Sequence, residues 1–275
     1  MPEVKPEPVT SLNFETTGSG RPVLALHGYG ATLFSWRHLP TGLPDRRIIR
    51  VDLAGHGGSP PRADRRYGPA DHAAQIIAFI DEQRLEQFDL IGHSLGGGVA
   101  LMIALHFAKL RPHAIRRLVL VDSVALPQPL PWLMRMIRVP LAGAFLFSRF
   151  PGRMVVRAVS PTAYHDRRCI TEEMICTYAQ NLATAAGRRA MIETARQIIP
   201  DDLPGLIARY HSLQLPTLLI WGKQDRVVSP AIGITLNTLI EGSKLILIDD
   251  CGHVPQEERP DIAIPAIADF LADRR

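Results

Sequence analysis

Cysteine is scarce in this chain of 275 residues, which contains only Cys169, Cys176 and Cys251. A small, odd number of cysteines fits a reducing cytoplasm better than a disulfide framework. No pair of them has the spacing or the histidine neighbours of a zinc site. We therefore expect a cytoplasmic protein without structural disulfides and without a metal centre.

Long apolar runs and nucleotide-binding motifs are also missing. The longest apolar run, Val139 to Phe147, contains Pro140 and Gly143 and is far too short to cross a bilayer. The first ten residues carry charges and prolines but no secretory signal. Neither a dinucleotide G-x-G-x-x-G after the first strand nor a P-loop is present. These absences predict no stable membrane insertion and no cofactor.

Hydrophobic residues make up 46% of the chain and charged residues 21%, which is the balance of a globular protein with a sizeable core. The formal net charge is +4, and Val124 to Gln214 alone holds 11 Lys/Arg against 6 Asp/Glu. This basic excess is either a solvated face or an attraction to an acidic surface or substrate. Because the arginines are scattered and form no recognisable nucleic-acid-binding motif, we expect no nucleic-acid partner.

Short apolar runs alternate with amphipathic stretches along most of the chain. The runs predict six strands and the stretches predict helices, at Pro69 to Gln83, Leu95 to Lys109, Pro230 to Ile240 and Pro260 to Leu271. The six strands are Val23 to Leu26, Ile48 to Asp52, Phe88 to Ile91, Leu118 to Val121, Thr217 to Trp221 and Lys244 to Ile248. This order indicates an α/β fold with a parallel sheet covered on both faces. Ligands of such sheets bind beyond the carboxyl ends of the strands.

One long stretch breaks the alternation. Residues 124–214 contain proline-punctuated helical segments and no strand pattern. We predict a core domain of residues 1–123 and 215–275, with residues 124–214 as a helical lid over the strand ends.

The strongest motif is Gly92-His93-Ser94-Leu95-Gly96, which directly follows a predicted strand and opens a helix. This G-x-S-x-G pattern is typical of a nucleophile elbow. Its sharp turn brings the backbone close to the neighbouring strand and helix, so positions 92 and 96 must lack a Cβ. Ser94 is therefore the candidate nucleophile, against the alternative of a helix-packing turn whose serine is only a cap.

A serine hydroxyl needs a base and an acid that orients the base. His253 follows the last predicted strand and is the histidine best placed to reach the strand ends. Asp225 follows the fifth strand, and the chain order Ser, Asp, His matches the elbow motif. Asp122, which directly follows the fourth strand, is the competing acid. Leu95 N–H and Tyr29 N–H, after the nucleophile and after the first strand, are the candidate oxyanion donors.

Together with His27-Gly28 and the turn from Asp52 to Ser59, these motifs resemble the α/β-hydrolase superfamily over about residues 9–273. The resemblance implies a mostly parallel, eight-stranded sheet with a helical cap, and it is closest to members with a serine nucleophile of esterase or lipase type. The two strands additional to our six would lie in Val9 to Thr17. Serine at position 94 argues against epoxide hydrolases and haloalkane dehalogenases, in which aspartate is expected.

Hydrolysis of a carboxylic ester through an acyl-enzyme is the leading functional prediction, with a small, lipophilic ester as the partner molecule. The Leu, Met, Phe and Trp content of the predicted lid favours an apolar acyl group, although helix packing explains it equally well. Family resemblance leaves two enzymatic alternatives open, a carbon–carbon bond hydrolase and a cofactor-free haloperoxidase or perhydrolase. A small-molecule receptor of the same fold is the non-enzymatic alternative.

Overall fold

The computed structural model describes residues 11–139, 145 and 149–272. Its centre is a sheet of seven strands in the order β1-β3-β2-β4-β5-β6-β7. All neighbouring strands run parallel except β1, which pairs antiparallel with β3. The strands are β1 (Phe14–Thr17), β2 (Arg21–Leu26), β3 (Arg46–Val51), β4 (Phe88–His93), β5 (Ile115–Val121), β6 (Thr217–Gly222) and β7 (Lys244–Ile248).

The α/β fold class and all six strands predicted from apolar runs are confirmed. The sheet has seven strands in the described residues, one fewer than the resemblance implied. Of the two strands expected in Val9 to Thr17, the structure shows β1, and residues 9 and 10 lie outside the described residues. The described part of that segment has room for one antiparallel strand and no turn into a second.

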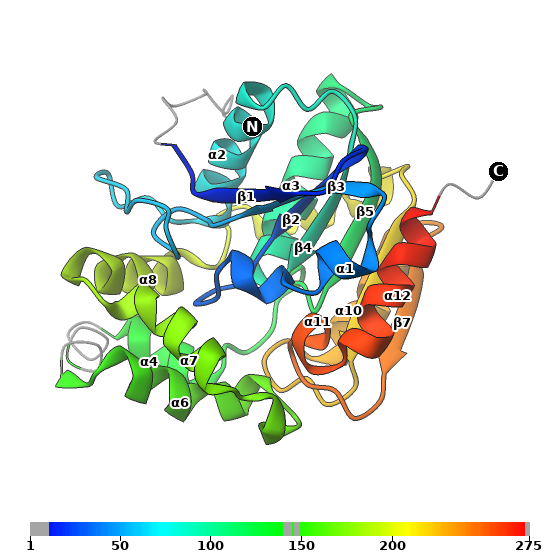
Figure 1. The fold of residues 1–275 in the computed structure, drawn as a ribbon. Helices are drawn as coiled ribbons and strands as arrows, with labels where there is room; N and C mark the ends of the chain where they lie inside the picture. The colour runs from blue at the N-terminus through cyan, green and yellow to red at the C-terminus, as the bar shows by residue number, and fades with distance from the viewer. Residues whose placement is uncertain (1–10, 140–144, 146–148, 273–275) are drawn as a thin grey trace.

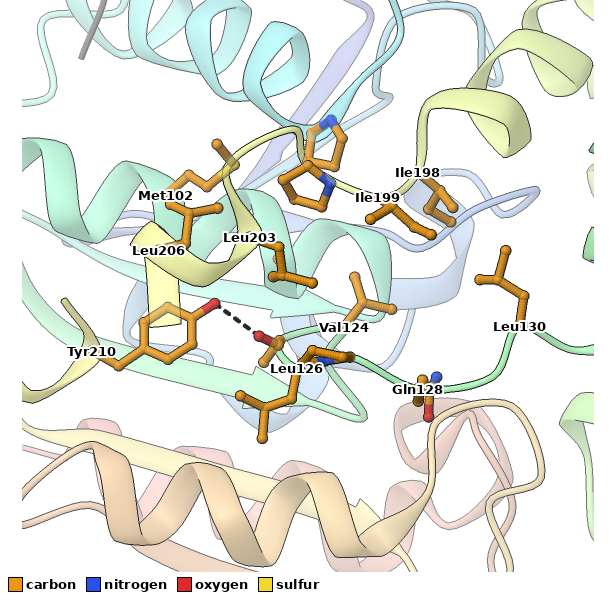
Figure 2. A pocket seen from close by; sticks show the side chains of 15 residues that line it. Met102, Val124, Leu126, Gln128, Leu130, Ile198, Ile199, Leu203, Leu206 and Tyr210 are labelled. Carbon is orange, nitrogen blue, oxygen red and sulfur yellow. Dashed lines mark hydrogen bonds between the residues drawn. The ribbon is translucent and has the colours of Figure 1, made fainter. Parts of the chain in front are cut away.

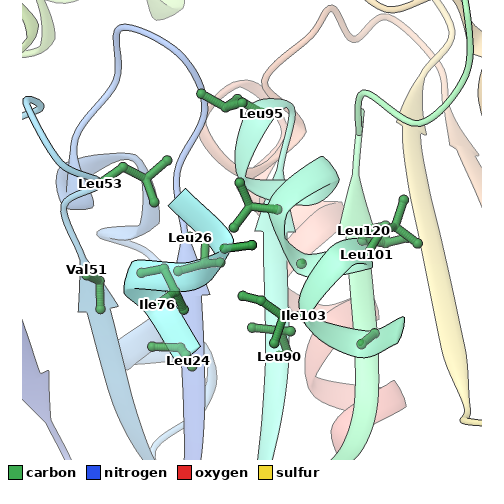
Figure 3. Packing of buried hydrophobic residues seen from close by; sticks show 14 of the residues in the cluster. Leu24, Leu26, Val51, Leu53, Ile76, Leu90, Leu95, Leu101, Ile103 and Leu120 are labelled. Carbon is green, nitrogen blue, oxygen red and sulfur yellow. The ribbon is translucent and has the colours of Figure 1, made fainter. Parts of the chain in front are cut away.

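Alternation along the strands places apolar side chains on both faces of the sheet. In β2, Leu24 and Leu26 belong to one buried cluster, whereas Val23 and Ala25 belong to another. The first cluster packs under α2 (Pro69–Glu82), α3 (Leu95–Leu110) and α10 (Pro230–Leu239), as Figure 3 shows for α2 and α3. The second packs under η1 (Leu33–Trp36), α1 (Leu39–Gly42) and α12 (Pro260–Leu271). Because each fully buried Leu or Ile stabilises the fold by about 1.5–3 kcal/mol, these two layers hold the strand ends in place.

Residues 124–214, which we call the inserted segment, connect β5 to β6. The helices that the structure describes there are α4 (Trp132–Arg138), α6 (Gly152–Ala163), η2 (Arg167–Cys169), α7 (Glu172–Ala179), η3 (Gln180–Leu182), α8 (Ala185–Gln197), α9 (Leu203–Ile207) and η4 (Tyr210–Ser212). Helices α4, α6, α7 and α8 lie together at one end of the sheet (Figure 1). This is the carboxyl end, because Asn181 contacts Gly30 after β2 and Ala163 contacts His253 after β7. A lid domain with boundaries at 124 and 214 stays a prediction.

None of the helices among the described residues combines the length and the apolar character that crossing a membrane requires. Location in the cytoplasm stays a prediction. The three cysteines are free thiols.

Candidate active site

Ser94 lies on the sharp turn between β4 and α3. Its backbone has φ 52° and ψ −116°, a conformation that a non-glycine residue adopts only under strain. A Cβ on Gly92 would lie 2.3 Å from the carbonyl oxygen of Gly96, and one on Gly96 would lie 2.5 Å from that of His27. Both glycines are therefore required by the close approach of strand, turn and helix, as the elbow motif predicts.

A continuous chain of hydrogen bonds joins the three side chains predicted as a triad. His253 Nε2 lies 2.9 Å from Ser94 Oγ, and His253 Nδ1 lies 2.7 Å from Asp225 Oδ2. All three residues are buried. Since β4, β6 and β7 all present their carboxyl ends at the same edge, residues distant in sequence meet there.

Asp225 is held in its ionised form. Burial by itself raises the pKa of this carboxyl, but the adjacent His253 ring and the N–H of Val227 lower it, and the net shift is downward. The N–H groups of Val227 and Val228 donate to Oδ1 at 2.7 and 3.0 Å, which leaves Oδ2 to face the imidazole. The carboxylate is thus oriented by backbone donors and accepts a hydrogen bond from Nδ1–H of His253.

Asp122, the competing acid, lies beside this pair rather than in contact with Ser94 or His253 through a hydrogen bond. Its Oδ1 accepts the N–H of Gly222 at 3.1 Å, and its buried carboxyl group also hydrogen-bonds to the carboxylate of Asp225. Burial, and then the charge of Asp225, raise its pKa well above the ordinary value. Asp122 is therefore a neutral carboxyl next to a charged one.

Asp122, Asp225 and His253 bring potential metal-ligand atoms within 4.8 Å of one another. However, the ligand atoms of Asp225 and His253 already hydrogen-bond to each other, to Ser94 and to backbone N–H groups. The atoms that would bind a cation are thus already paired with one another, and we assign no cation to this cluster.

The predicted oxyanion donors lie on either side of the nucleophile. Leu95 is the first residue of α3, so its N–H has no acceptor within the helix. The loop that carries Tyr29 approaches from β2, and a Cβ on its neighbour Gly28 would lie 3.0 Å from Ser94 Cβ. The phenol of Tyr29 donates instead to the carbonyl of Met191 at 3.0 Å, so only the backbone of Tyr29 is available for an oxyanion.

Other histidines after strands make structural hydrogen bonds. His27 Nε2 accepts the N–H of Leu53 at 2.9 Å, while its Nδ1 lies 2.8 Å from the carbonyl oxygen of Gly28. His93 Nε2 lies 2.7 Å from the carbonyl oxygen of His253 and helps to fix that loop. Burial lowers the pKa of His27 to about 4 and that of His93 to about 3, so both rings are neutral.

Three residues that sequence reasoning missed tie the site to the inserted segment. Asn181 donates to the carbonyl oxygens of Gly30 and Ala31 at 2.7 and 3.1 Å and accepts the N–H of Gly57 at 2.6 Å. The Glu257 carboxylate accepts a hydrogen bond from the Arg37 guanidinium at 2.8 Å. It also accepts hydrogen bonds from the hydroxyls of Tyr178 at 2.7 Å and Tyr164 at 3.1 Å.

Glu258, the third, accepts three backbone N–H groups, from Gly252 at 2.9 Å, His165 at 3.1 Å and Asp166 at 2.6 Å. Its carboxylate therefore connects the loop of His253 to the end of α6. No local sequence pattern predicts such long-range contacts. The sequence offers one signal, the adjacent acids Glu257 and Glu258 in α11 (Pro255–Glu258). The structure shows that both are almost completely buried.

A cavity of about 230 Å³, which we call the catalytic cavity, extends from Ser94 and His253 into the inserted segment. Most of its wall is aliphatic, including Met134, Val155 and Val159. Polar side chains such as Ser160, Asn181 and Glu257 form the rest of the wall, and Lys and Arg are absent from its described lining residues. A neutral, largely apolar molecule is what such a wall accommodates best.

The family model described as alpha/beta hydrolase family matches residues 23–265. The chain belongs to this α/β hydrolase family. It is 28% identical to a 2-hydroxy-6-oxo-2,4-heptadienoate hydrolase of Pseudomonas putida (strain F1), over 94% of this chain and 92% of the relative. Among solved structures, a meta-cleavage product hydrolase from Pseudomonas fluorescens IP01 superimposes with a TM-score of 0.77 at 21% identity, covering 94% of this chain and 93% of the other.

A thermophilic esterase from Thermogutta terrifontis is similar too, with a TM-score of 0.76 and 25% identity over 94% of this α/β hydrolase and 92% of the esterase. Hydrolase function is thus supported, whereas ester specificity is not. The names of the curated relatives favour the carbon–carbon bond alternative over the ester prediction.

Proposed function

We propose that this α/β hydrolase cleaves an uncharged, largely apolar carboxylic ester by a serine-nucleophile mechanism. The observation that carries the proposal is the unbroken chain from Ser94 Oγ through the His253 ring to Asp225, at 2.9 and 2.7 Å. Ser94 and His253 line the catalytic cavity, whose wall is mostly aliphatic.

In the first half of the reaction, Ser94 Oγ attacks the ester carbonyl carbon while His253 Nε2 takes the hydroxyl proton. The carbonyl π electrons move to oxygen, and the N–H groups of Leu95 and Tyr29 receive the oxyanion. The carbon–oxygen bond then breaks as Nε2 returns the proton to the leaving alkoxide. The products of this half are a free alcohol and an acyl group on Ser94.

The second half repeats the sequence with water. His253 Nε2 takes a proton from water, whose oxygen attacks the acyl carbon. Collapse of the oxyanion breaks the bond to Ser94 Oγ, which regains its proton from Nε2. Asp225 stabilises the imidazolium in both halves without taking the proton itself.

Hydrolysis of a carbon–carbon bond is the second candidate, and the curated relatives favour it. The same attack on a ketone would break the bond to a carbon whose electron pair an adjacent carbonyl stabilises, and Nε2 would protonate that carbon. A dienoate substrate carries a carboxylate, however, and no Lys or Arg stands among the described residues that line the catalytic cavity. An anion there would lose its hydration without gaining an opposite charge, which places the neutral ester first.

The test compares turnover of neutral p-nitrophenyl esters with turnover of a dienoate ring-cleavage product and of a neutral β-diketone. We expect multiple turnovers on the esters, loss of that activity in Ser94→Ala, and labelling of Ser94 by a fluorophosphonate. Ser19→Ala, at an exposed position in the turn between β1 and β2, is the matched control. Preference for either diketone-type substrate would transfer the conclusion to carbon–carbon hydrolysis, and a single slow turnover would indicate a receptor.

A further inference from the structure

A second cavity of about 160 Å³ lies between α3 and the part of the inserted segment around α9. Figure 2 shows side chains from both sides directed towards it, among them Met102, Leu126, Ile199, Leu203, Leu206 and Tyr210. The second cavity is partly open to solvent, and Ile199 in its wall is 47% exposed. Apolar side chains left in contact with water favour an apolar occupant.

The polar groups in its wall are already engaged. The Tyr210 hydroxyl donates to the carbonyl oxygen of Ala125 at 3.0 Å, as the dashed line in Figure 2 marks. The Gln128 side chain donates to the carbonyl oxygen of Val227 at 3.0 Å and accepts the N–H of Ser229 at 3.2 Å. What these groups leave for a ligand is an aliphatic surface, so the chemistry of the wall selects an apolar group.

The second cavity adjoins the catalytic cavity. Val124, Gln128, Leu130 and Ile198 line both of them. Val124 also donates its backbone N–H to the carbonyl oxygen of Ser94 at 3.1 Å, so the shared wall begins at the nucleophile itself. These four side chains separate the two cavities, and a chain attached to a carbonyl at Ser94 would enter the second cavity by passing between them.

We propose that the second cavity is a subsite for the apolar end of the substrate, either an unbranched alkyl chain or a phenyl group. The proposal rests on the proposed function, because it takes the reacting carbonyl to be at Ser94. An engineered apolar cavity of about 150 Å³ holds a benzene molecule, so a volume of this size accepts a group of roughly six carbons. The substrate class is therefore an ester with one medium-length or arylalkyl arm beyond the part held in the catalytic cavity.

Filling the cavity tests this assignment. Leu203→Trp adds bulk from α9, and Met102→Trp adds it independently from α3. Ala208→Trp, at an exposed position just after α9, is the matched control. Two ester series are compared, one with acyl chains of two to twelve carbons on a fixed alcohol and one with alcohols of the same lengths on a fixed acetyl group, so that the arm entering the subsite is identified.

In the native sequence we expect kcat/KM to rise by about fourfold for each methylene that becomes buried. Both cavity-filling variants should lower the ratio of long-chain to acetyl-ester kcat/KM at least tenfold in one series, whereas Ala208→Trp should retain the native ratio. An unchanged length profile in two folded variants would overturn the subsite. The acetyl ester separates this from failure of the proposed function, since its Ser94-dependent hydrolysis does not need the second cavity.

A binding measurement decides the matter if no ester is turned over. Benzene, which has the size of the proposed subsite, should raise the Tm of the native protein by more than that of Leu203→Trp or Met102→Trp. Equal Tm shifts in all three proteins would place the ligand elsewhere and refute the assignment.

Discussion

Replacing Asp225 by asparagine removes the negative charge beside His253 while almost preserving the shape of the side chain. The N–H groups of Val227 and Val228 require an acceptor at the position of Oδ1, so the amide oxygen of the new residue takes that place. Its NH2 group then faces His253 Nδ1, at the position where Oδ2 lies 2.7 Å away. The ring must place its proton on Nε2, which points it at Ser94 Oγ and prevents Nε2 from accepting the serine proton.

The expected loss in kcat is about 10⁴-fold, which corresponds to about 5.4 kcal/mol in the activation free energy. Asp122→Asn provides the matched comparison one strand away. Asp122 is already neutral, its Oδ1 accepts the N–H of Gly222, and an amide reproduces both features. We expect kcat to fall no more than about fivefold, the equivalent of one neutral hydrogen bond.

The measurement is kcat on a p-nitrophenyl ester for both variants, with circular dichroism to establish that each is folded. Equal losses in the two variants, or a larger loss for Asp122→Asn, would refute the reasoning and assign the orienting role to Asp122.

Three further perturbations follow from the same contacts. Gly96→Ala should destabilise the protein by about 1–3 kcal/mol or more in urea unfolding, because the new Cβ meets rigid backbone oxygens at 2.5 and 2.6 Å; a change under 0.5 kcal/mol would contradict this. The pKa of Asp122 is raised in the folded protein, so this group contributes fully to the free energy of unfolding below the pKa it has in the unfolded chain. That contribution is lost as the pH rises towards the pKa in the folded protein. The Tm of Asp122→Asn relative to the native protein should therefore be higher at pH 8 than at pH 5, and an equal difference at the two pH values would show that Asp122 is ionised in the folded protein. Glu258→Gln removes one acceptor oxygen from a carboxylate that binds three backbone N–H groups. We expect kcat to fall about tenfold with little change in KM. Glu173→Gln, at an exposed position, is the control.

Local patterns predicted the elements that position the nucleophile. The predicted bounds of β7 and α12 agree with the structure at both ends, because a continuous apolar run and a proline-initiated amphipathic stretch each carry a clear period. The elbow was equally readable because its five-residue motif is contiguous, although the contacts that require Gly96 come from Leu26 and His27 at the end of β2.

The choice between the two aspartates was harder to derive from sequence. Both follow strands, and the structure places both in the same buried cluster. What separates them is the distribution of backbone donors, two on Asp225 Oδ1 and one on Asp122 Oδ1, together with the direction in which the free oxygen faces. These are properties of the folded loops rather than of strand order. The eighth strand stays a prediction, because residues 9 and 10 of its segment lie outside the described residues and the sequence there has only a weak pattern.

The inserted segment contacts the proposed catalytic groups directly and is more than a cover. The His253 N–H donates to the carbonyl oxygen of Ala163 at 2.6 Å, and Glu258 holds the residues that follow Ala163 against the same loop. On the opposite side, Asn181 fixes the loop that carries Tyr29 N–H. A movement of the segment that widens either cavity would therefore also displace the base or an oxyanion donor. We therefore expect substrate length and alignment of the proposed catalytic groups to be coupled, because the same helices form the cavity walls and hold the two loops beside Ser94.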